Sequence, residues 1–443
     1  MTSRRITLLS LLLISPVALS QADPHSFATS TSAPGQADTN PTDLQDAPST
    51  TAALSLDDAI AMASKSSPRL HEAQAITQQA TAAARTSRAY TNPNIEVFEG
   101  RQYARPISTP GVPGLLQHYA GYQTIEIPSE RRARQKTAQF AIASTQAAQR
   151  GVTISVVADV KHAFYNALRR REEINHAREN LQLVQDLRRR VEVEVNVGEK
   201  GRLELTRAEA ELARAQFAVR SAQIEYNNAI ALLRVAIAAP AEASLSPQGN
   251  LDSRIALLPI DQLRQSVLAA HPAVAQSKAD IEAAQTSLER QKLLRIPQPQ
   301  LFGEFENQPD LRFWRMGVNV PIPLWDRRRG QIDEAKAAIS QSNAVLDQRR
   351  LELISALERA YEQYQLADQQ VTSLEAGSLR AAESAVDAAK AAYRYGERGI
   401  VEVLDAQRVL QSVRGDLLDA QYARQSALID LEELGAVAPG AKP

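Results

Sequence analysis

The stretch Tyr393-Arg394-Tyr395-Gly396-Glu397-Arg398-Gly399, followed at once by Ile400-Val401-Glu402-Val403-Leu404-Asp405-Ala406-Gln407, decides how this chain folds. Its two glycines can adopt the positive φ angle that ends a helix, so one long helix is predicted to end here and another to begin. A similar stretch occurs earlier in the chain, as Val197-Gly198-Glu199-Lys200-Gly201-Arg202-Leu203-Glu204-Leu205. The sequence therefore predicts two helical hairpins.

Apolar residues recur alternately three and four positions apart after each turn, which is typical of helices that pack along one another. After the first turn they are Leu205, Ala208, Leu212, Ala215, Val219, Ala222, Tyr226, Ala229 and Leu233. After the second turn the equivalent positions hold Val403, Ala406, Leu410, Val413, Leu417, Ala420, Arg424, Ala427 and Leu431. Only Arg424 interrupts this apolar stripe.

The composition favours long helices over globular cores, because aromatic residues make up only 5% of the 443 residues. Lysine plus arginine (50) nearly balances aspartate plus glutamate (51), which gives no reason to expect nucleic acid as a partner. The absence of cysteine excludes disulfides, thiolate metal ligands and an acylated N-terminal cysteine.

The N-terminus has the features of a secretory signal peptide, predicted over residues 1–22. Two arginines precede an apolar run from Ile6 to Leu19, which is shorter than the ~20 residues of a membrane-spanning anchor, the alternative interpretation. Residues 23–53 are rich in Ser, Thr, Pro and Asp and are expected to form a disordered leader. Without another long apolar stretch, strands would have to make any membrane crossing.

Two repeats with the same order of elements are expected, at residues 54–239 and 260–436, separated by a linker at 240–259 and followed by a tail at 437–443. In the first repeat we expect a helix capped by Ser55, a helix from Pro68 to Tyr90, strands at 95–98 and 119–127, and a helix capped by Ser129. In the second repeat we expect helices from Asp261 and Pro272, strands at 301–307 and 313–320, and a long helix from Asp326. The predicted fold class is mainly α with a small β part.

The last strand alternates between two kinds of side chain. Trp314, Met316, Val318 and Val320 share one face, whereas the other carries Phe313, Arg315, Gly317 and Asn319. This pattern favours a wall between lipid and water over a soluble hairpin packed on helices. Because roughly eight strands are needed to close a barrel, several chains would have to share one.

These features resemble the TolC-like outer-membrane efflux proteins, over residues 54–435. The segments that carry the resemblance are Asn92 to Glu96, Val160 to Leu168, Leu203 to Ala213, Pro321 to Ile332 and Tyr393 to Gln407. The resemblance implies a homotrimer in the outer membrane, with a twelve-stranded β-barrel that continues into a long periplasmic α-barrel of helices. It also implies a periplasmic adaptor and a proton-driven inner-membrane pump of the RND type as partners.

Within this family, three segments are most similar to the cobalt-zinc-cadmium resistance branch: Phe164 to Leu168, Leu203 to Glu209 and Pro321 to Arg327. The resemblance therefore implies export of divalent heavy-metal cations. Organic solutes or drugs are the alternative cargo, since substrate choice lies mostly in the pump. A soluble periplasmic coiled-coil adaptor is a remoter alternative, which would explain the heptads but not the two strand pairs.

The resemblance also implies roles for residues near the turns. Glu402 and Asp405 match pore-facing acidic positions, so a trimer would present two carboxylate rings that attract cations and raise one another's pKa. From the residues alone, an ordinary solvated acidic face of a heptad helix is the favoured interpretation, and the family match reverses that preference. Glu402 stands where the family usually has aspartate, which affects the pore width.

Tyr393 and Arg398 match family positions that hold the duct closed. Their expected partners are the backbone carbonyl of Leu203 and the carboxylate of Glu204. The exposed turns are expected to meet the adaptor through Gly198, Lys200, Gly201, Arg202, Gly396, Arg398 and Gly399.

No catalytic motif is present, and no enzymatic activity, cofactor or metal site is predicted. The histidines are scattered, and none has carboxylates nearby at a convincing ligand spacing in the sequence: His25, His71, His118, His162, His176 and His271. We expect the chain to conduct metal ions rather than to hold them.

Overall fold

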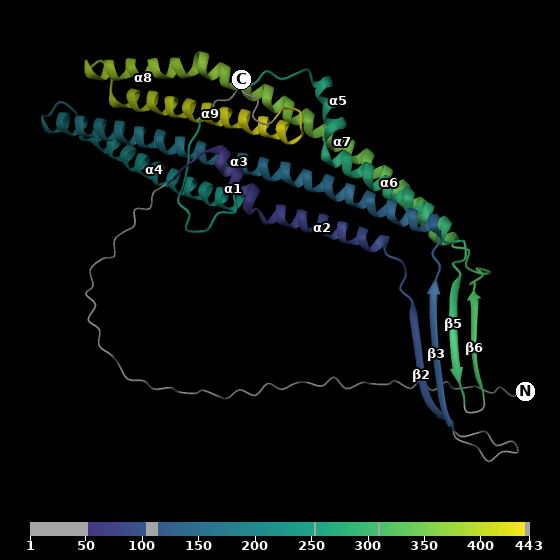
Figure 1. Ribbon diagram of the computed structural model, residues 1–443. Helices are drawn as coiled ribbons and strands as arrows, with labels where there is room; N and C mark the ends of the chain where they lie inside the picture. The colour runs from purple at the N-terminus through teal and green to yellow at the C-terminus, as the bar shows by residue number, and fades with distance from the viewer. Residues whose placement is uncertain (1–51, 103–113, 252–253, 309–310, 439–443) are drawn as a thin grey trace, which may run out of the picture. The chain divides into compact units, whose positions relative to one another are not determined.

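A computed structural model describes residues 52–102, 114–251, 254–308 and 311–438 (Figure 1). The expected signal peptide, nearly all of the expected leader and the last residues of the tail lie outside this part of the chain. At the end of the leader, β1 (Ala52–Leu54) pairs in parallel with β4 (Leu245–Pro247), which lies inside the expected linker. The end of the leader is therefore ordered, contrary to the prediction, and the expected linker contains a short strand.

The first repeat contains the four predicted helices. Ser55 caps the first of them, because its hydroxyl accepts a hydrogen bond from the Asp58 N–H at 3.1 Å, as predicted. Ser129 does not cap the long helix, since Pro128 already occupies the first helical position and Ile127 precedes it as the N-cap. The helices are α1 (Leu56–Ser66), α2 (Pro68–Arg88), α3 (Pro128–Asn196) and α4 (Arg202–Ala236).

The second repeat follows the same order, with one interruption. Its helices are α5 (Ile260–Ala270), α6 (Pro272–Leu293), α7 (Arg329–Ser373), α8 (Leu379–Arg394) and α9 (Ile400–Glu433). The long helix was expected from Asp326 but begins at Arg329, because Arg328 has a φ of 54° and donates its N–H to the Asp326 carboxylate at 2.8 Å. A π-helical turn, η1 (Leu374–Ser378), separates α7 from α8.

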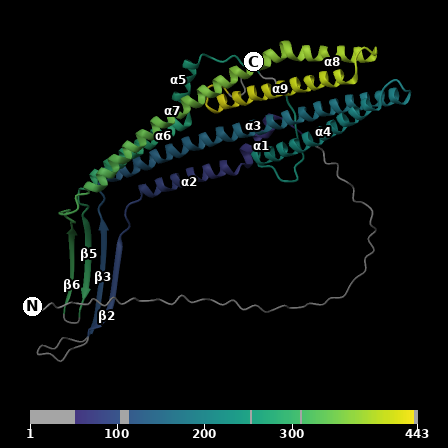
Figure 2. The same ribbon diagram turned by 180° about the vertical axis from the view of Figure 1, so that it is seen from behind.

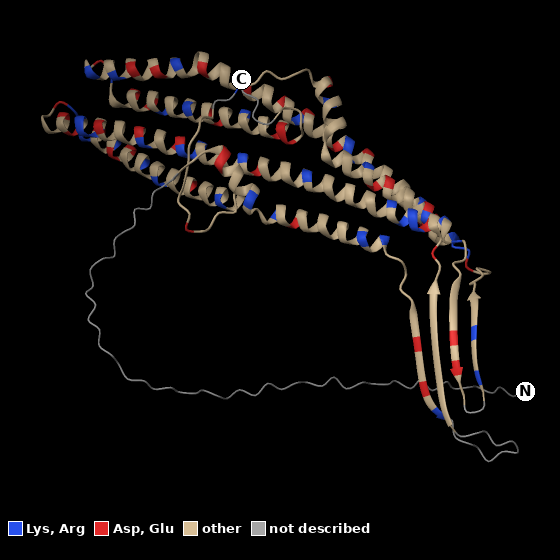
Figure 3. Ribbon diagram, in the orientation of Figure 1, with Lys and Arg blue, Asp and Glu red and all other residues tan. Residues whose placement is uncertain are grey.

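The heptad stripes form the contacts between the long helices, as predicted. In both Figure 1 and Figure 2, α4 lies along α3 and α9 lies along α8. One apolar core includes Phe164 and Leu233 of the first repeat, and a second includes Leu357 and Leu431 of the second. Arg424, the exception in the stripe, is 2% exposed and pairs with Asp368 of α7 at 3.1 Å. Lysines and arginines are interspersed with acidic residues along the helices, and of the four long strands only β3 carries no Lys, Arg, Asp or Glu (Figure 3).

The four long strands form one antiparallel sheet in the order β2-β3-β5-β6. They are β2 (Asn94–Gln102), β3 (Gly114–Thr124), β5 (Gln300–Asn307) and β6 (Arg312–Asn319). The second strand begins and ends earlier than the predicted 119–127. Because β3 of the first repeat pairs with β5 of the second, the duplication is joined through the centre of the sheet.

The two faces of the sheet differ in polarity. The register aligns Val97, Tyr119, Phe305 and Trp314 across one face, and Trp314 is 73% exposed. The opposite face carries His118, Glu304, Glu306 and Arg315 among its side chains. Within the described residues, β2 and β6 have no further strand beside them. The predicted division into an apolar and a polar face is therefore confirmed.

None of the helices in the described part of the chain combines the length and the apolar content that a membrane-spanning helix needs.

Candidate functional site

The two hairpin turns have the same backbone geometry. Gly198 and Gly396 have φ angles of 83° and 74°, and each is followed by an N–H that bonds to a carbonyl five residues back: Glu199 to Glu194 at 2.9 Å, and Glu397 to Ala392 at 3.0 Å. Both are Schellman turns, which require positive φ at this position. The second glycine of each turn, Gly201 or Gly399, is an N-cap with extended backbone that any residue can adopt.

Apolar packing brings the two hairpins together near these turns. Leu187 and Val191 of α3 and Ala208 of α4 form one buried cluster with Tyr393 of α8 and three residues of α9: Ile400, Val403 and Leu404. Burial of this apolar surface is the main stabilisation of the contact. The two hairpins therefore contact each other near their turns, and the predicted residue Tyr393 lies in that contact.

Tyr393 is 8% exposed, and its hydroxyl donates a hydrogen bond to Glu194 Oε2 of α3 at 2.5 Å. Burial, and then the Glu194 carboxylate, raise the pKa of the Tyr393 hydroxyl well above its usual value. This hydrogen bond joins the two hairpins, and its acceptor is Glu194 rather than the expected carbonyl of Leu203. Sequence reasoning missed Glu194, although it lies on the last turn of α3.

Arg398 does not pair with Glu204 in this chain. Its guanidinium is 67% exposed, and its carboxylate neighbour is Glu402, at 4.0 Å on the same hairpin. Glu204 Oε2 is shielded from solvent and has no hydrogen-bond partner among the described residues. The Glu204 charge nevertheless contributes to the raised pKa of Tyr393, so its carboxylate lies at the contact between hairpins. Leu203 is 61% exposed.

Glu402 and Asp405 both lie exposed on α9, which is compatible with the acidic rings and with an ordinary solvated helix face alike. The negative charge of Asp405 is partly offset, because Arg408 Nη1 lies 3.2 Å from its carboxylate. Arg408 also donates to Glu211 Oε2 of α4 at 2.7 Å, and the Glu211 side chain is only 11% exposed. Arg408 and Glu211 were not predicted, and they form a second polar link between the hairpins.

The cationic residues of the turns differ in their exposure to solvent. Arg202 and Arg398 are exposed, whereas the Lys200 ammonium lies 5.6 Å from the centre of the Tyr393 ring. A cation over an aromatic face is a favourable contact, which positions Lys200 against the second hairpin.

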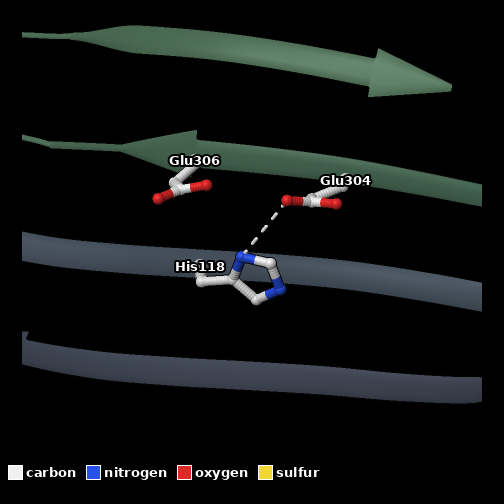
Figure 4. A group of neighbouring side chains, drawn as sticks. All are labelled: His118, Glu304 and Glu306. Carbon is white, nitrogen blue, oxygen red and sulfur yellow. Dashed lines mark ion pairs between the residues drawn. The ribbon is translucent and has the colours of Figure 1, made fainter.

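A second polar group lies on the sheet. Figure 4 shows His118 of β3 with Glu304 and Glu306 of β5, and their potential ligand atoms all lie within 4.8 Å of one another. No metal site was predicted from the sequence, in which His118 has no carboxylate nearby at a convincing ligand spacing. Its carboxylate neighbours are supplied by the other repeat, and only the β3–β5 register reveals them.

The family model described as "Outer membrane efflux protein" matches residues 59–239 and 263–436. The chain therefore belongs to the outer membrane efflux protein family. The fold and the family are those of channel proteins rather than enzymes.

Named relatives specify the branch. The cobalt-zinc-cadmium resistance protein CzcC of Cupriavidus metallidurans is 25% identical over 295 residues, which cover 66% of this chain and 70% of that protein. The cation efflux system protein CusC of Escherichia coli is 26% identical over 302 residues, 65% of each chain. The resemblance to the metal-resistance branch that the sequence indicated is confirmed.

Solved structures agree on the fold. A crystal structure of CusC has a TM-score of 0.74 at 20% identity and covers 86% of this chain and 91% of its own. The outer membrane protein VceC of Vibrio cholerae has a TM-score of 0.73 at 16% identity, with 86% and 96% covered.

Proposed function

We propose that this chain is the outer-membrane duct of a tripartite, proton-driven efflux system that exports divalent heavy-metal cations. The four-stranded sheet, with one apolar and one polar face, is the observation that supports a duct. A sheet of this kind is stable between lipid and an aqueous lumen.

The proposed assembly is a homotrimer. One chain supplies four strands whose two outer strands have unpaired edges within the described residues, and such edges are normally paired or covered. Three chains would close a barrel of twelve strands, and their helices would form the periplasmic α-barrel. A periplasmic adaptor would meet the turns around Gly198 and Gly396, and an RND-type pump would supply the cation.

The hairpin turns are proposed as the gate of this duct. Glu402 and Asp405 would provide the acidic rings, and the Tyr393–Glu194 hydrogen bond would hold the two hairpins of each chain together. Adaptor docking would favour an open state in which the hairpins separate. Cysteine crosslinking from Lys200 or Arg202 to the adaptor tests the docking, and the absence of any adduct from the turns would contradict it.

The proposed cargo is supported by the names of the relatives, of which CzcC is described as a cobalt-zinc-cadmium resistance protein. A strain lacking this chain should become sensitive to zinc, cobalt, cadmium or nickel salts, and the wild-type gene should restore growth. If metal tolerance is unchanged while tolerance of organic solutes or drugs falls, the alternative cargo is correct.

Membrane fractionation tests the remaining alternative. An outer-membrane duct stays in the membrane fraction at high salt, whereas a soluble periplasmic adaptor is released.

A further inference from the structure

We propose that His118, Glu304 and Glu306 form a binding site for a divalent transition-metal ion on the polar face of the sheet. The site deepens the proposed function, because a metal-exporting duct would deliver the ion to it. All three residues come from the two central strands, β3 and β5, so each protomer contains a complete site.

The strand register creates the group. His118 lies directly opposite Glu306 in the β3–β5 pair, and Glu304 is two residues along the same strand, so that all three side chains share one face (Figure 4). The Phe98 ring lies 5.6 Å from the imidazole, centre to centre, and restricts its orientation. The imidazole therefore faces the two carboxylates without any rearrangement of the backbone.

The separation of the ligand atoms suits a metal ion better than a direct contact. His118 Nδ1 and Glu304 Oε1 are 3.6 Å apart, which is too far for a good hydrogen bond. Two ligand atoms at ~2.1 Å from a tetrahedral zinc ion would lie about 3.4 Å from each other. The observed gap is close to that value.

Arg315 completes the surroundings of Glu304. Its Nε and Nη2 donate to the two Glu304 oxygens at 2.8 and 2.7 Å, and the Glu304 side chain is 4% exposed. Each carboxylate oxygen accepts two hydrogen bonds or ligand bonds, so Oε1 can bind both Arg315 and an ion. Ligand carboxylates in metal sites are commonly oriented by such partners. With Glu306, the group has two negative charges and one positive, and a divalent cation offsets the excess.

The ligand set selects the class of ion. One imidazole and two carboxylates suit zinc, cobalt or nickel, whereas soft monovalent ions prefer thiolate and thioether ligands. None of the chain's three methionines and no cysteine belongs to this group. A hollow of about 310 Å³ borders His118 and Glu306, which gives an ion and its remaining water ligands a way in.

Zinc titration of the detergent-solubilised full-length protein by calorimetry tests the site, with Co²⁺ as a spectroscopic probe. We expect one ion per chain, and binding at least about tenfold weaker in His118→Ala and in Glu306→Gln. Glu99→Gln is the matched control, because Glu99 borders the same hollow but lies on the other face of the sheet, where it accepts a hydrogen bond from Tyr119. The zinc affinity of this variant should equal that of the wild type. Glu306→Gln preserves the shape of the side chain, so it decides the question if His118→Ala fails to assemble.

Equal zinc affinity in wild type and in the assembled variants, or a Co²⁺ spectrum identical to that of the free aqueous ion, would overturn the proposal. The outcome is separate from the test of the proposed function. If the purified protein binds zinc but the deletion strain is not metal-sensitive, metal export is refuted and the site remains. If the deletion strain is metal-sensitive but the purified protein binds no zinc, the site is refuted and metal export remains.

Discussion

Replacing Tyr393 with phenylalanine removes one hydroxyl from the contact between hairpins and keeps the ring that packs in its apolar cluster. The lost hydrogen bond has a charged acceptor, is 2.5 Å long and is shielded from solvent. Such bonds contribute about 1.5–3 kcal/mol. If the hairpins of all three protomers separate together on opening, the closed state loses at least about 4.5 kcal/mol relative to the open state, roughly a thousandfold in the equilibrium.

Single-channel recording in planar bilayers measures this change. We expect Tyr393→Phe to raise conductance strongly, and Arg398→Ala to raise it little, because Arg398 is exposed and 4.0 Å from its neighbouring carboxylate, a geometry that contributes less than about 1 kcal/mol. The matched control is Tyr395→Phe, since Tyr395 lies on the same turn but is 78% exposed.

Unchanged conductance in Tyr393→Phe, with the trimer intact, would refute the reasoning. An equal increase in Tyr395→Phe would refute it as well, because the effect would then not depend on the buried bond.

Three stability predictions follow from polar groups along the helices. His271 Nδ1 accepts a hydrogen bond from the Ala273 N–H, and burial lowers the His271 pKa. His271→Ala should therefore lower the free energy of unfolding by about 1 kcal/mol above pH 6.5, and by less at lower pH, where the ring is protonated and cannot accept this bond. Ser67→Ala is the control in thermal melting, because Ser67 has the equivalent position but makes no side-chain cap bond. Arg424→Leu should cost about 1.5 kcal/mol in the same assay, because Asp368 loses this buried partner but keeps Arg254 at 2.9 Å, although leucine restores the heptad; a more stable variant would contradict this. Burial raises the pKa of Glu433, so Glu433→Gln should stabilise the protein at neutral pH by up to about 1 kcal/mol, with no gain in melting temperature below pH 4.5; a loss at neutral pH would exclude it.

Local chemistry made the helices predictable. Ser55 followed by Asp58 marks a cap, Gly198 and Gly396 mark turns, and the heptad spacing marks the buried face, and each of these signals acts within a few residues. The π-helical turn at Leu374–Ser378 was not predicted, because its one irregular signal, the pair Gly377-Ser378, is also tolerated within an α-helix.

Long-range pairing limited the prediction of the site. The acceptor of Tyr393 is Glu194, a residue of the other repeat, and nothing around either residue specifies that contact. The same holds for Arg408 with Glu211, and for His118 with Glu304 and Glu306. A sequence read in order shows which residues carry the chemistry, whereas the register between repeats decides which of them meet.

The central claim is that a single chain cannot pair the outer strands β2 and β6 of its own sheet, and that several copies must form one barrel in a membrane. The most direct measurement is the mass of the purified protein with and without detergent, combined with circular dichroism to monitor the helices. The account predicts a detergent-bound trimer extracted from the outer membrane. A folded, helical monomer that stays in solution without detergent would contradict it.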